Sequence, residues 1–189
     1  PLVGGDRIKN YHLIKILSKY FDIYLVSITN ESIDKKGLDF LEKYTFHYKI
    51  FKKSKLDMIL STFKTFFNNK PLQVNYYYFN DIKKYINNLS KDMDLIIPTL
   101  VRTAEYAINL DVPKIFDMAD SLGLNYKKSV TQTKSLFWKI IFSFEYKRLL
   151  NYEKKCIDSY DFTSMFNKGE IKHFKSNKVF FLPYSANND

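Results

Sequence analysis

Apolar residues recur along this chain with two periods, which predict an alternation of helices and strands. Near the start, one helix face carries residues spaced four, three and four apart: Asn10, Ile14, Leu17 and Phe21. The apolar run of residues 23–28 indicates a buried strand directly after that helix. Residues 45–51 alternate apolar and polar side chains, which is typical of a second strand.

The same alternation continues to the end of the chain. Helical spacing predicts helices over residues 35–43, 54–68, 80–90 and 135–157, one from Asn167 or Lys168 to Phe174, and one that begins at Thr99 or Arg102. The longest of them, 135–157, carries one stripe of inward residues: Trp138, Phe142, Leu149, Tyr152 and Cys156. Short apolar runs predict strands over residues 94–98, 112–116, 161–165 and 178–182. Strands that alternate with helices favour an α/β fold, a doubly wound parallel sheet with helices on both faces.

The first candidate binding element is the glycine pair that precedes the first helix. Gly4 and Gly5 can adopt backbone angles closed to other residues and let a ligand approach the main chain. Asp6 is a candidate N-cap for the helix. In a doubly wound sheet, ligands bind at such a loop and helix N-terminus, at the strand ends. A simple turn explains the same glycine pair, and this alternative stays open.

A second candidate element follows the predicted strand 112–116. Asp117, Asp120 and Ser121 come just after it, where residues line the ligand crevice of a parallel sheet. Two carboxylates three residues apart suit a general base or a pair that binds hydroxyl groups. A helix N-cap at Asp120 or Ser121 explains them equally well.

Composition limits the function classes. The chain has 189 residues and a net charge of +10, which favours nucleic acid, an anionic membrane surface or phosphorylated substrates as partners. The single cysteine, Cys156, excludes a disulfide within these residues and fits a helix core better than a nucleophile. His12, His47 and His173 lie far apart, so no metal site is expected.

Lysines surround the apolar stripe of the predicted helix 54–68. We expect the stripe itself (Leu56, Ile59, Leu60, Phe63 and Phe67) to pack on the sheet and Phe66 to remain outside. The lysines would then favour peripheral contact with an anionic lipid surface: Lys52, Lys53, Lys55 and Lys64. No signal peptide or apolar run of spanning length is present, so we expect a cytoplasmic protein, with this contact at the inner face of the plasma membrane.

Four stretches in order resemble one enzyme family. The first is GGDRIKNYHLIKILSKYFDIYLVS, with Gly4, Gly5, Asp6, Arg7, Tyr11, His12 and Leu13 as matching positions. The others are PLQVNYYY from Pro71 and the segment 113–130 with Asp117, Asp120, Leu124 and Tyr126. The final LPYSANND departs from the family's IPNGVD, but Pro183, Asn188 and Asp189 keep its outline. Together they resemble glycosyltransferase family 4, in its sugar-transferase branch of bacterial polysaccharide biosynthesis.

The resemblance implies the N-terminal, acceptor-side half of a GT-B glycosyltransferase. Residues 1–182 would form a Rossmann-like domain that lacks its first strand, and residues 183–189 would begin the hinge to an absent C-terminal donor domain. Such enzymes move a sugar from a nucleotide-sugar donor to an acceptor, here a sugar or lipid-linked acceptor, and their chemistry needs no divalent metal or other cofactor. We expect this half to be inactive alone.

The resemblance also implies residue roles. Gly4 and Gly5 would bring backbone N–H groups to the donor diphosphate or the acceptor. The acceptor or a donor phosphate would be contacted by Asp6, Arg7 and Asn10, with Arg102 as a second phosphate ligand. Ser121 would bind substrate, and Asp117 or Asp120 would orient or deprotonate the acceptor. Many relatives have a histidine after this strand and this chain has none, so the base stays open between the two aspartates.

One family motif is not carried over. Glu145 and Glu153 have the E-x7-E spacing known from the second domain of the family, but we expect both on a solvated, basic helix. The alternative function is a non-catalytic, basic Rossmann-like module that binds phosphorylated ligands or RNA. It ranks lower because the aromatic residues are expected at inward positions. A nucleotide-sugar epimerase or dehydrogenase ranks lowest, since no G-x-G-x-x-G loop is present.

Overall fold

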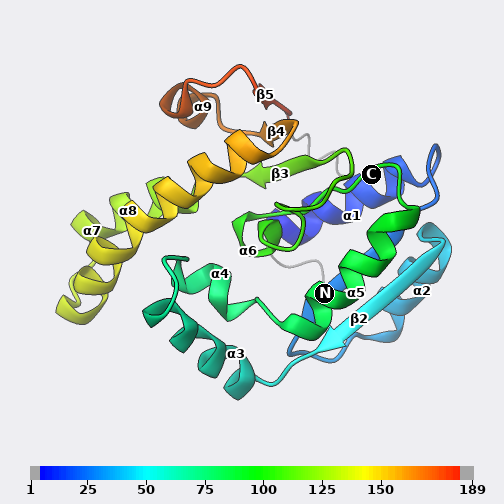
Figure 1. Cartoon of the computed structure of the whole chain (residues 1–189), viewed down its shortest axis with the longest axis horizontal. Coiled ribbons are helices and arrows are strands. Elements are labelled where there is room, and N and C mark those ends of the chain that lie inside the picture. The colour runs from blue at the N-terminus through cyan, green and yellow to red at the C-terminus, as the bar shows by residue number, and fades with distance from the viewer. Residues whose placement is uncertain (1–4, 184–189) are drawn as a thin grey trace. The chain divides into compact units, whose positions relative to one another are not determined.

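The structure is a computed structural model that describes residues 5–183, with side chains described from Arg7 onward. It is a mixed α/β protein with short parallel sheets (Figure 1). The chain divides into two compact units, and each is described by itself below. Unit 1 comprises Pro1–Asp57 and Tyr184–Asp189, and unit 2 comprises Met58–Pro183.

Unit 1 pairs two parallel strands with two helices. Its elements are α1 (Gly5–Leu17), β1 (Tyr24–Thr29), α2 (Lys35–Tyr44) and β2 (His47–Lys52). The strands pair from Tyr24 opposite His47 to Thr29 opposite Lys52. Helix α2 begins where the Asp34 carboxylate accepts a hydrogen bond from the Gly37 backbone N–H, and it buries Leu41 as its spacing predicts. These elements confirm the expected alternation over residues 23–51.

The first helix differs from the prediction at both ends. It begins at Gly5, so Asp6 lies inside its first turn and is not its N-cap. It ends at Leu17, and a turn follows in which the Phe21 N–H donates to the Leu17 carbonyl. Phe21 is exposed and does not continue the inward helix face.

Unit 2 holds a second parallel sheet, with strand order β3-β4-β5. Its elements begin with α3 (Lys55–Thr62), which starts in unit 1, η1 (Phe63–Phe66), α4 (Leu72–Tyr76), α5 (Asn80–Leu89), η2 (Ser90–Asp92) and α6 (Val101–Ala104). They continue with β3 (Ile115–Ala119), α7 (Leu122–Gln132), α8 (Leu136–Ser159), β4 (Phe162–Met165), α9 (Lys168–Phe174) and β5 (Val179–Phe181). Helix α8 therefore stands between two paired parallel strands along the chain, as the α/β pattern predicts.

Two predicted strands of unit 2 need correction. Residues 94–98 form no strand. Isolated parallel bridges instead join Ile96 to Lys114, just before β3, and Thr99 to Asp117 of β3. The predicted strand 112–116 lies three residues further on, at Ile115–Ala119. Asp117 therefore lies within the strand and not after it, and its backbone pairs with that of Ser164. The helix expected from Thr99 or Arg102 is only α6, and it ends before Tyr106.

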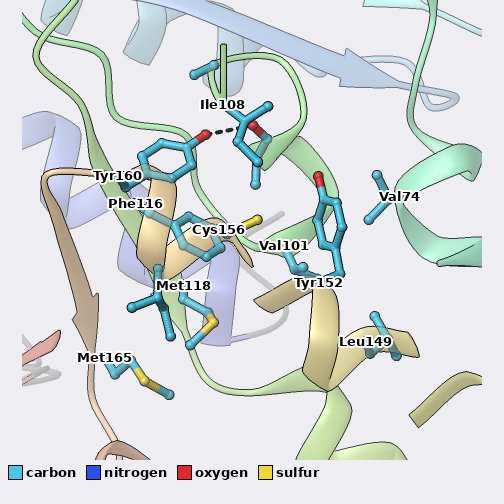
Figure 2. Packing of buried hydrophobic residues seen from close by; sticks show 13 residues of the cluster. Val74, Val101, Ile108, Phe116, Met118, Leu149, Tyr152, Cys156, Tyr160 and Met165 are labelled. Atoms are coloured by element: carbon cyan, nitrogen blue, oxygen red, sulfur yellow. Dashed lines mark hydrogen bonds between the residues drawn. The ribbon is translucent and has the colours of Figure 1, made fainter. Parts of the chain in front are cut away.

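The core of unit 2 lies between β3 and the second half of α8. Figure 2 shows Phe116 and Met118 of β3 beside Cys156 and Tyr152 of α8, all of them buried. Tyr160 follows α8, and its hydroxyl donates to the Ala104 carbonyl at 2.6 Å. The stripe expected on the longest helix is thus confirmed for its C-terminal half.

The first half of α8 is exposed. Figure 1 shows α7 and α8 side by side as a helical hairpin whose tip, at residues 133–135, points away from β3 and β4. Trp138, expected in the buried stripe, is 50% exposed. Phe137 and Phe144 are also exposed.

For residues 54–68, the prediction that the apolar side packs inward is wrong. The buried residues of α3 and η1 are Met58, Ser61 and Thr65, whereas the apolar stripe is exposed: Leu56, Ile59, Leu60, Phe63 and Phe67, together with Phe66. The segment that packs against α3 and η1 offers polar groups at Asn75 and Tyr78, so polar side chains face it. The Ser61 hydroxyl donates to the Tyr78 carbonyl at 2.9 Å, and the Asn75 amide donates to the Thr65 hydroxyl at 2.7 Å. The expectation that aromatic residues lie mainly inward is wrong as well.

Candidate functional site

The C-terminal edge of the unit 2 sheet collects the second group of predicted site residues. Asp117 lies in β3, opposite Ser164 of β4. The Thr99 segment pairs with Asp117 from the other side, and the Leu100 N–H donates to the Asp117 carbonyl at 2.8 Å. This is the edge at which open α/β sheets bind their ligands.

The backbone is strained at the same edge. Leu100 and Ala119 have φ angles of 65° and 64°, in the left-handed region that residues with a β-carbon seldom occupy. Ala119 is held there partly by the Phe166 N–H, which donates to its carbonyl at 3.0 Å. Strain of this kind costs about 1–3 kcal/mol per residue and concentrates at functional sites. Two such residues at one edge mark it as the leading site in the described part of the chain.

The two candidate aspartates have different surroundings. Asp117 is 3% exposed, and its carboxylate accepts a hydrogen bond from the Ser164 hydroxyl at 2.7 Å. Asp120 is half-buried, and one of its oxygens accepts from the Asn125 side-chain amide at 2.7 Å. Solvent or a ligand therefore reaches the Asp120 carboxylate more readily than the Asp117 carboxylate.

Ser121 is the N-cap of α7, as the alternative interpretation of this segment predicts. Its hydroxyl oxygen accepts from the Leu124 N–H at 3.0 Å and donates to Glu153 at 2.6 Å. Ser121 is fully buried. It therefore orients the segment that carries Asp120 but is enclosed in the structure described.

Two buried glutamates at this segment were not predicted. Glu153 of α8 accepts from the Ser121 hydroxyl and from the Gly123 N–H at 3.0 Å, and Glu170 of α9 accepts from the Ser121 N–H at 2.7 Å. Burial, with a smaller contribution from Glu170, raises the pKa of Glu153 to about 7, although its hydrogen bonds oppose the shift. Both carboxylates hold the N-terminus of α7 against α8 and α9.

The expectation that Glu145 and Glu153 lie on a solvated helix is wrong, because both are fully buried. Glu145 accepts from the Leu72 N–H at 2.7 Å, at the start of α4, and burial raises its pKa. The sequence did carry a signal for this. Glu145 and Glu153 share the helix face of Leu149, Tyr152 and Cys156, which the apolar spacing already placed inward.

Arg102 lies close to the start of this edge. It belongs to the short helix α6 and is half-buried, with its guanidinium 5.5 Å from the Tyr77 ring centre. Its charge also acts on the Tyr126 hydroxyl of α7, which in turn accepts from the Gln73 amide at 3.2 Å. Burial nevertheless raises the pKa of Tyr126. The charge of Arg102 is thus felt at the helix that Ser121 caps.

The first group of predicted site residues belongs to unit 1. Gly4 lies outside the described residues, and Gly5 and Asp6 form the backbone of the first turn of α1. The Arg7 guanidinium lies 3.2 Å from the Glu31 carboxylate, with both side chains exposed. Asn10 is half-buried. That these residues share one site with Arg102 and Asp120 stays a prediction, because the two groups lie in different units.

Among the residues with described side chains, no three His, Cys, Asp or Glu residues are grouped so that they could hold a metal ion. Cys156 lies in the core, where burial raises the pKa of its thiol. Searched over the described residues, no helix has the length and apolar character needed to cross a membrane.

This edge offers the half-buried carboxylate of Asp120 and, on α6, the guanidinium of Arg102. A carboxylate such as Asp120 accepts hydrogen bonds from sugar hydroxyls and can accept a proton. The guanidinium of Arg102 suits a phosphate or carboxylate ligand.

Comparison with known proteins adds no assignment: no protein-family model matches the chain, and no curated protein or solved structure shows significant similarity to it.

Proposed function

We propose that this chain is the acceptor-side domain of a glycosyltransferase that transfers a sugar from a nucleotide-sugar donor to an acceptor in cell-surface polysaccharide or glycoconjugate synthesis. The proposal includes a Rossmann-like, doubly wound fold for residues 1–182 and the start of an interdomain hinge at residues 183–189. The acceptor is a sugar or a lipid-linked sugar. The proposal rests on the resemblance of four sequence stretches to glycosyltransferase family 4.

One structural observation supports the proposal most strongly. Leu100 and Ala119 both have left-handed backbone angles, and both lie at the C-terminal edge of a parallel sheet. Leu100 follows Thr99, and Ala119 belongs to β3. Beside them lie the half-buried carboxylate of Asp120 and the guanidinium of Arg102. A transferase needs such a rigid edge to hold an acceptor hydroxyl in line with a donor.

The proposal gives each residue of this edge a role. Asp120 orients the acceptor hydroxyl or accepts its proton, and Arg102 contacts a phosphate of the donor or of a lipid-linked acceptor. Asp117 supports this edge from inside the sheet through Ser164. Glu153 and Glu170 are positioning residues, since they hold the Ser121 segment and not a substrate.

The proposal is tested with the product of the complete reading frame that encodes this chain, because donor binding is assigned to a second domain. The protein is incubated with a panel of nucleotide sugars and candidate acceptors, and release of free nucleotide is measured. Asp120→Asn and Arg102→Gln are compared with Asp111→Asn, a matched control at an exposed residue before β3. We expect release with one donor, a loss of at least about 100-fold in Asp120→Asn, and no change in the control.

Nucleotide release that Asp120→Asn leaves unchanged would remove Asp120 from the site. No release with any donor, from a folded protein, would overturn the transferase proposal. If the same protein then bound phosphorylated ligands or RNA, the non-catalytic module would replace it.

A further inference from the structure

We propose that the first half of α8, together with the exposed side of α3 and η1, forms a docking surface for an anionic lipid bilayer. The inference does not depend on the proposed catalytic function. We call the surface the α8–η1 face. Its apolar residues in unit 2 are Ile59, Leu60, Phe63, Phe66, Phe67, Leu136, Phe137, Trp138, Ile140 and Phe144.

The α8 part of this face is apolar where a solvated helix would be polar. Leu136, Ile140 and Phe144 are spaced four residues apart, so they share one side of the helix, and each is more than 60% exposed. The opposite side of α8 carries the buried residues Leu149 and Cys156. Leu136, Ile140 and Phe144 also line an open groove of about 490 Å³ together with Lys139 and Ser143.

The α3–η1 part also exposes apolar residues, and here polar residues are buried. Its polar residues Ser61 and Thr65 pack inward, while Phe66 and Phe67 are 80% and 92% exposed. A helix that buries its polar side and exposes its apolar side lacks a partner for a large apolar area. The exposed side therefore requires an explanation other than packing within unit 2.

Arg148 joins the two parts. Its guanidinium donates to the Lys70 carbonyl at 2.8 Å and to the Asn68 carbonyl at 3.3 Å, just after Phe67. The same guanidinium lies 5.2 Å from the centre of the Phe144 ring. The exposed phenylalanines of η1 are thus fastened to the part of α8 that exposes Phe144.

The charge pattern favours anionic lipid as the occupant. Residues 121–144 contain four lysines and no aspartate or glutamate. All four, Lys127, Lys128, Lys134 and Lys139, are exposed and flank the hairpin tip. Trp and Phe side chains with neighbouring lysines are the composition of helices that lie in a lipid interface, where the lysine stems extend toward the headgroups.

The aliphatic residues distinguish lipid from RNA. Single-stranded RNA is bound by stacking of bases on aromatic rings, to which Leu136, Ile140, Ile59 and Leu60 contribute no ring. A bilayer interface accepts aliphatic and aromatic side chains alike. The mixture on the α8–η1 face therefore fits lipid better.

The lysines proposed from sequence have a smaller part in this surface. Lys64 turns inward, and its ammonium donates to the Tyr78 carbonyl at 3.1 Å and to the Ser61 hydroxyl at 3.0 Å. Lys52, Lys53 and Lys55 belong to unit 1. Unit 2 instead supplies the four lysines of the α7–α8 hairpin.

Trp138 gives a direct readout, because it is the single tryptophan among the 189 residues. The chain is mixed with vesicles of phosphatidylcholine alone or with added phosphatidylglycerol, and Trp138 emission and its quenching by acrylamide are recorded. We expect a blue shift and protection from acrylamide only with the anionic vesicles. Added salt should weaken both effects, because it screens the lysines.

Two variants test the two contributions, each with a matched control. The triple variant Leu136→Ala, Ile140→Ala, Phe144→Ala should lower vesicle binding at least about tenfold, whereas Tyr20→Ala, Phe21→Ala, Phe46→Ala should not. Glutamine at Lys127, Lys128, Lys134 and Lys139 should lower binding at least about 100-fold, since each lysine near an anionic surface contributes about fivefold and the four contributions multiply. Glutamine at Lys154, Lys155, Lys168 and Lys172, all exposed in unit 2, should have much less effect.

Other occupants of the face would give other results. A blue shift that needs no vesicles and grows with protein concentration, together with a dimer in sedimentation, would assign the face to a second copy. Protection of Trp138 by an RNA oligonucleotide but not by anionic vesicles would assign it to RNA. Either result, or equal binding to neutral vesicles, overturns the proposal.

Discussion

Gly123 of α7 stands against the backbone of Leu150 of α8 with no space for a methyl group. A β-carbon built on Gly123 would lie 2.9 Å from the Leu150 nitrogen and 2.8 Å from its Cγ. The close contact brings the Gly123 N–H to the Glu153 carboxylate. The start of α7, and with it the Asp120 segment, is therefore set by how closely two helices approach.

Gly123→Ala should destabilise the protein. The methyl group would meet backbone as well as a side chain, so α7 must move away from α8, at a cost of about 1–3 kcal/mol that the better helix propensity of alanine offsets only in part. Urea denaturation measures the difference. Lys128→Ala, at an exposed position of α7, is the control and should change stability by less than about 0.5 kcal/mol. Equal midpoints for the two variants would contradict the close contact.

The pKa of Glu153 predicts how stability depends on pH. Burial raises its pKa from the ordinary value of 4.5 to about 7 in the folded protein, so between these pH values the folded state keeps a proton that the unfolded chain has lost. The contribution of this group is complete below pH 4.5 and is lost as pH rises to 7, by about 3 kcal/mol. Glu153→Gln should remove this decrease. The free energy of unfolding is measured at several pH values for both proteins.

Asp158→Asn is the control for that experiment, because Asp158 lies exposed on the same helix. It should leave the pH dependence of the native chain unchanged. Glu145, whose pKa burial also raises, keeps its own contribution in every variant, so the difference between the native chain and Glu153→Gln isolates Glu153. Parallel pH profiles for these two proteins would show that Glu153 is charged when folded.

The pair of Glu145 and Arg148 should show strong coupling. The Arg148 guanidinium lies 3.1 Å from the fully buried Glu145 carboxylate and also donates to the Asn68 and Lys70 carbonyls. Arg148→Met leaves the carboxylate without its cation, which costs about 3–5 kcal/mol for a buried pair. The double variant with Glu145→Leu should lose less than the sum of the single variants. A double-mutant cycle in urea denaturation measures the coupling, and additive losses would contradict it.

The sequence predicted helix ends well where a capping residue marks them. Ser135 and Asn167 precede α8 and α9 and cap them through side-chain hydrogen bonds, as expected near residues 135 and 167. It failed where a polar side chain is satisfied by a distant residue. Apolar periodicity cannot show that the Ser164 hydroxyl donates to Asp117 inside the sheet. Nor can it show that the Ser61 hydroxyl donates to the Tyr78 carbonyl, which places the polar side of α3 inward.

The candidate site was predicted only in part for the same reason. Asp120 and Arg102 stand near the sheet edge where the order of strands places them, because topology alone fixes that edge. Glu153 and Glu170 contact Ser121 from α8 and α9, across sequence separations of 32 and 49 residues. No local sequence pattern predicts contacts between residues so far apart in the chain.

Asp117 and Asp120 should separate stability from activity. Asp117 is 3% exposed and accepts the Ser164 hydroxyl, so Asp117→Asn should lower the free energy of unfolding by about 1–3 kcal/mol. Asp120 is half-buried and bonded to Asn125, close to the surface, so Asp120→Asn should cost less than about 1 kcal/mol while it removes transferase activity. Urea denaturation and nucleotide release are measured on the same preparations. If Asp117→Asn folds as stably as the native chain and loses activity alone, the roles of the two aspartates are reversed.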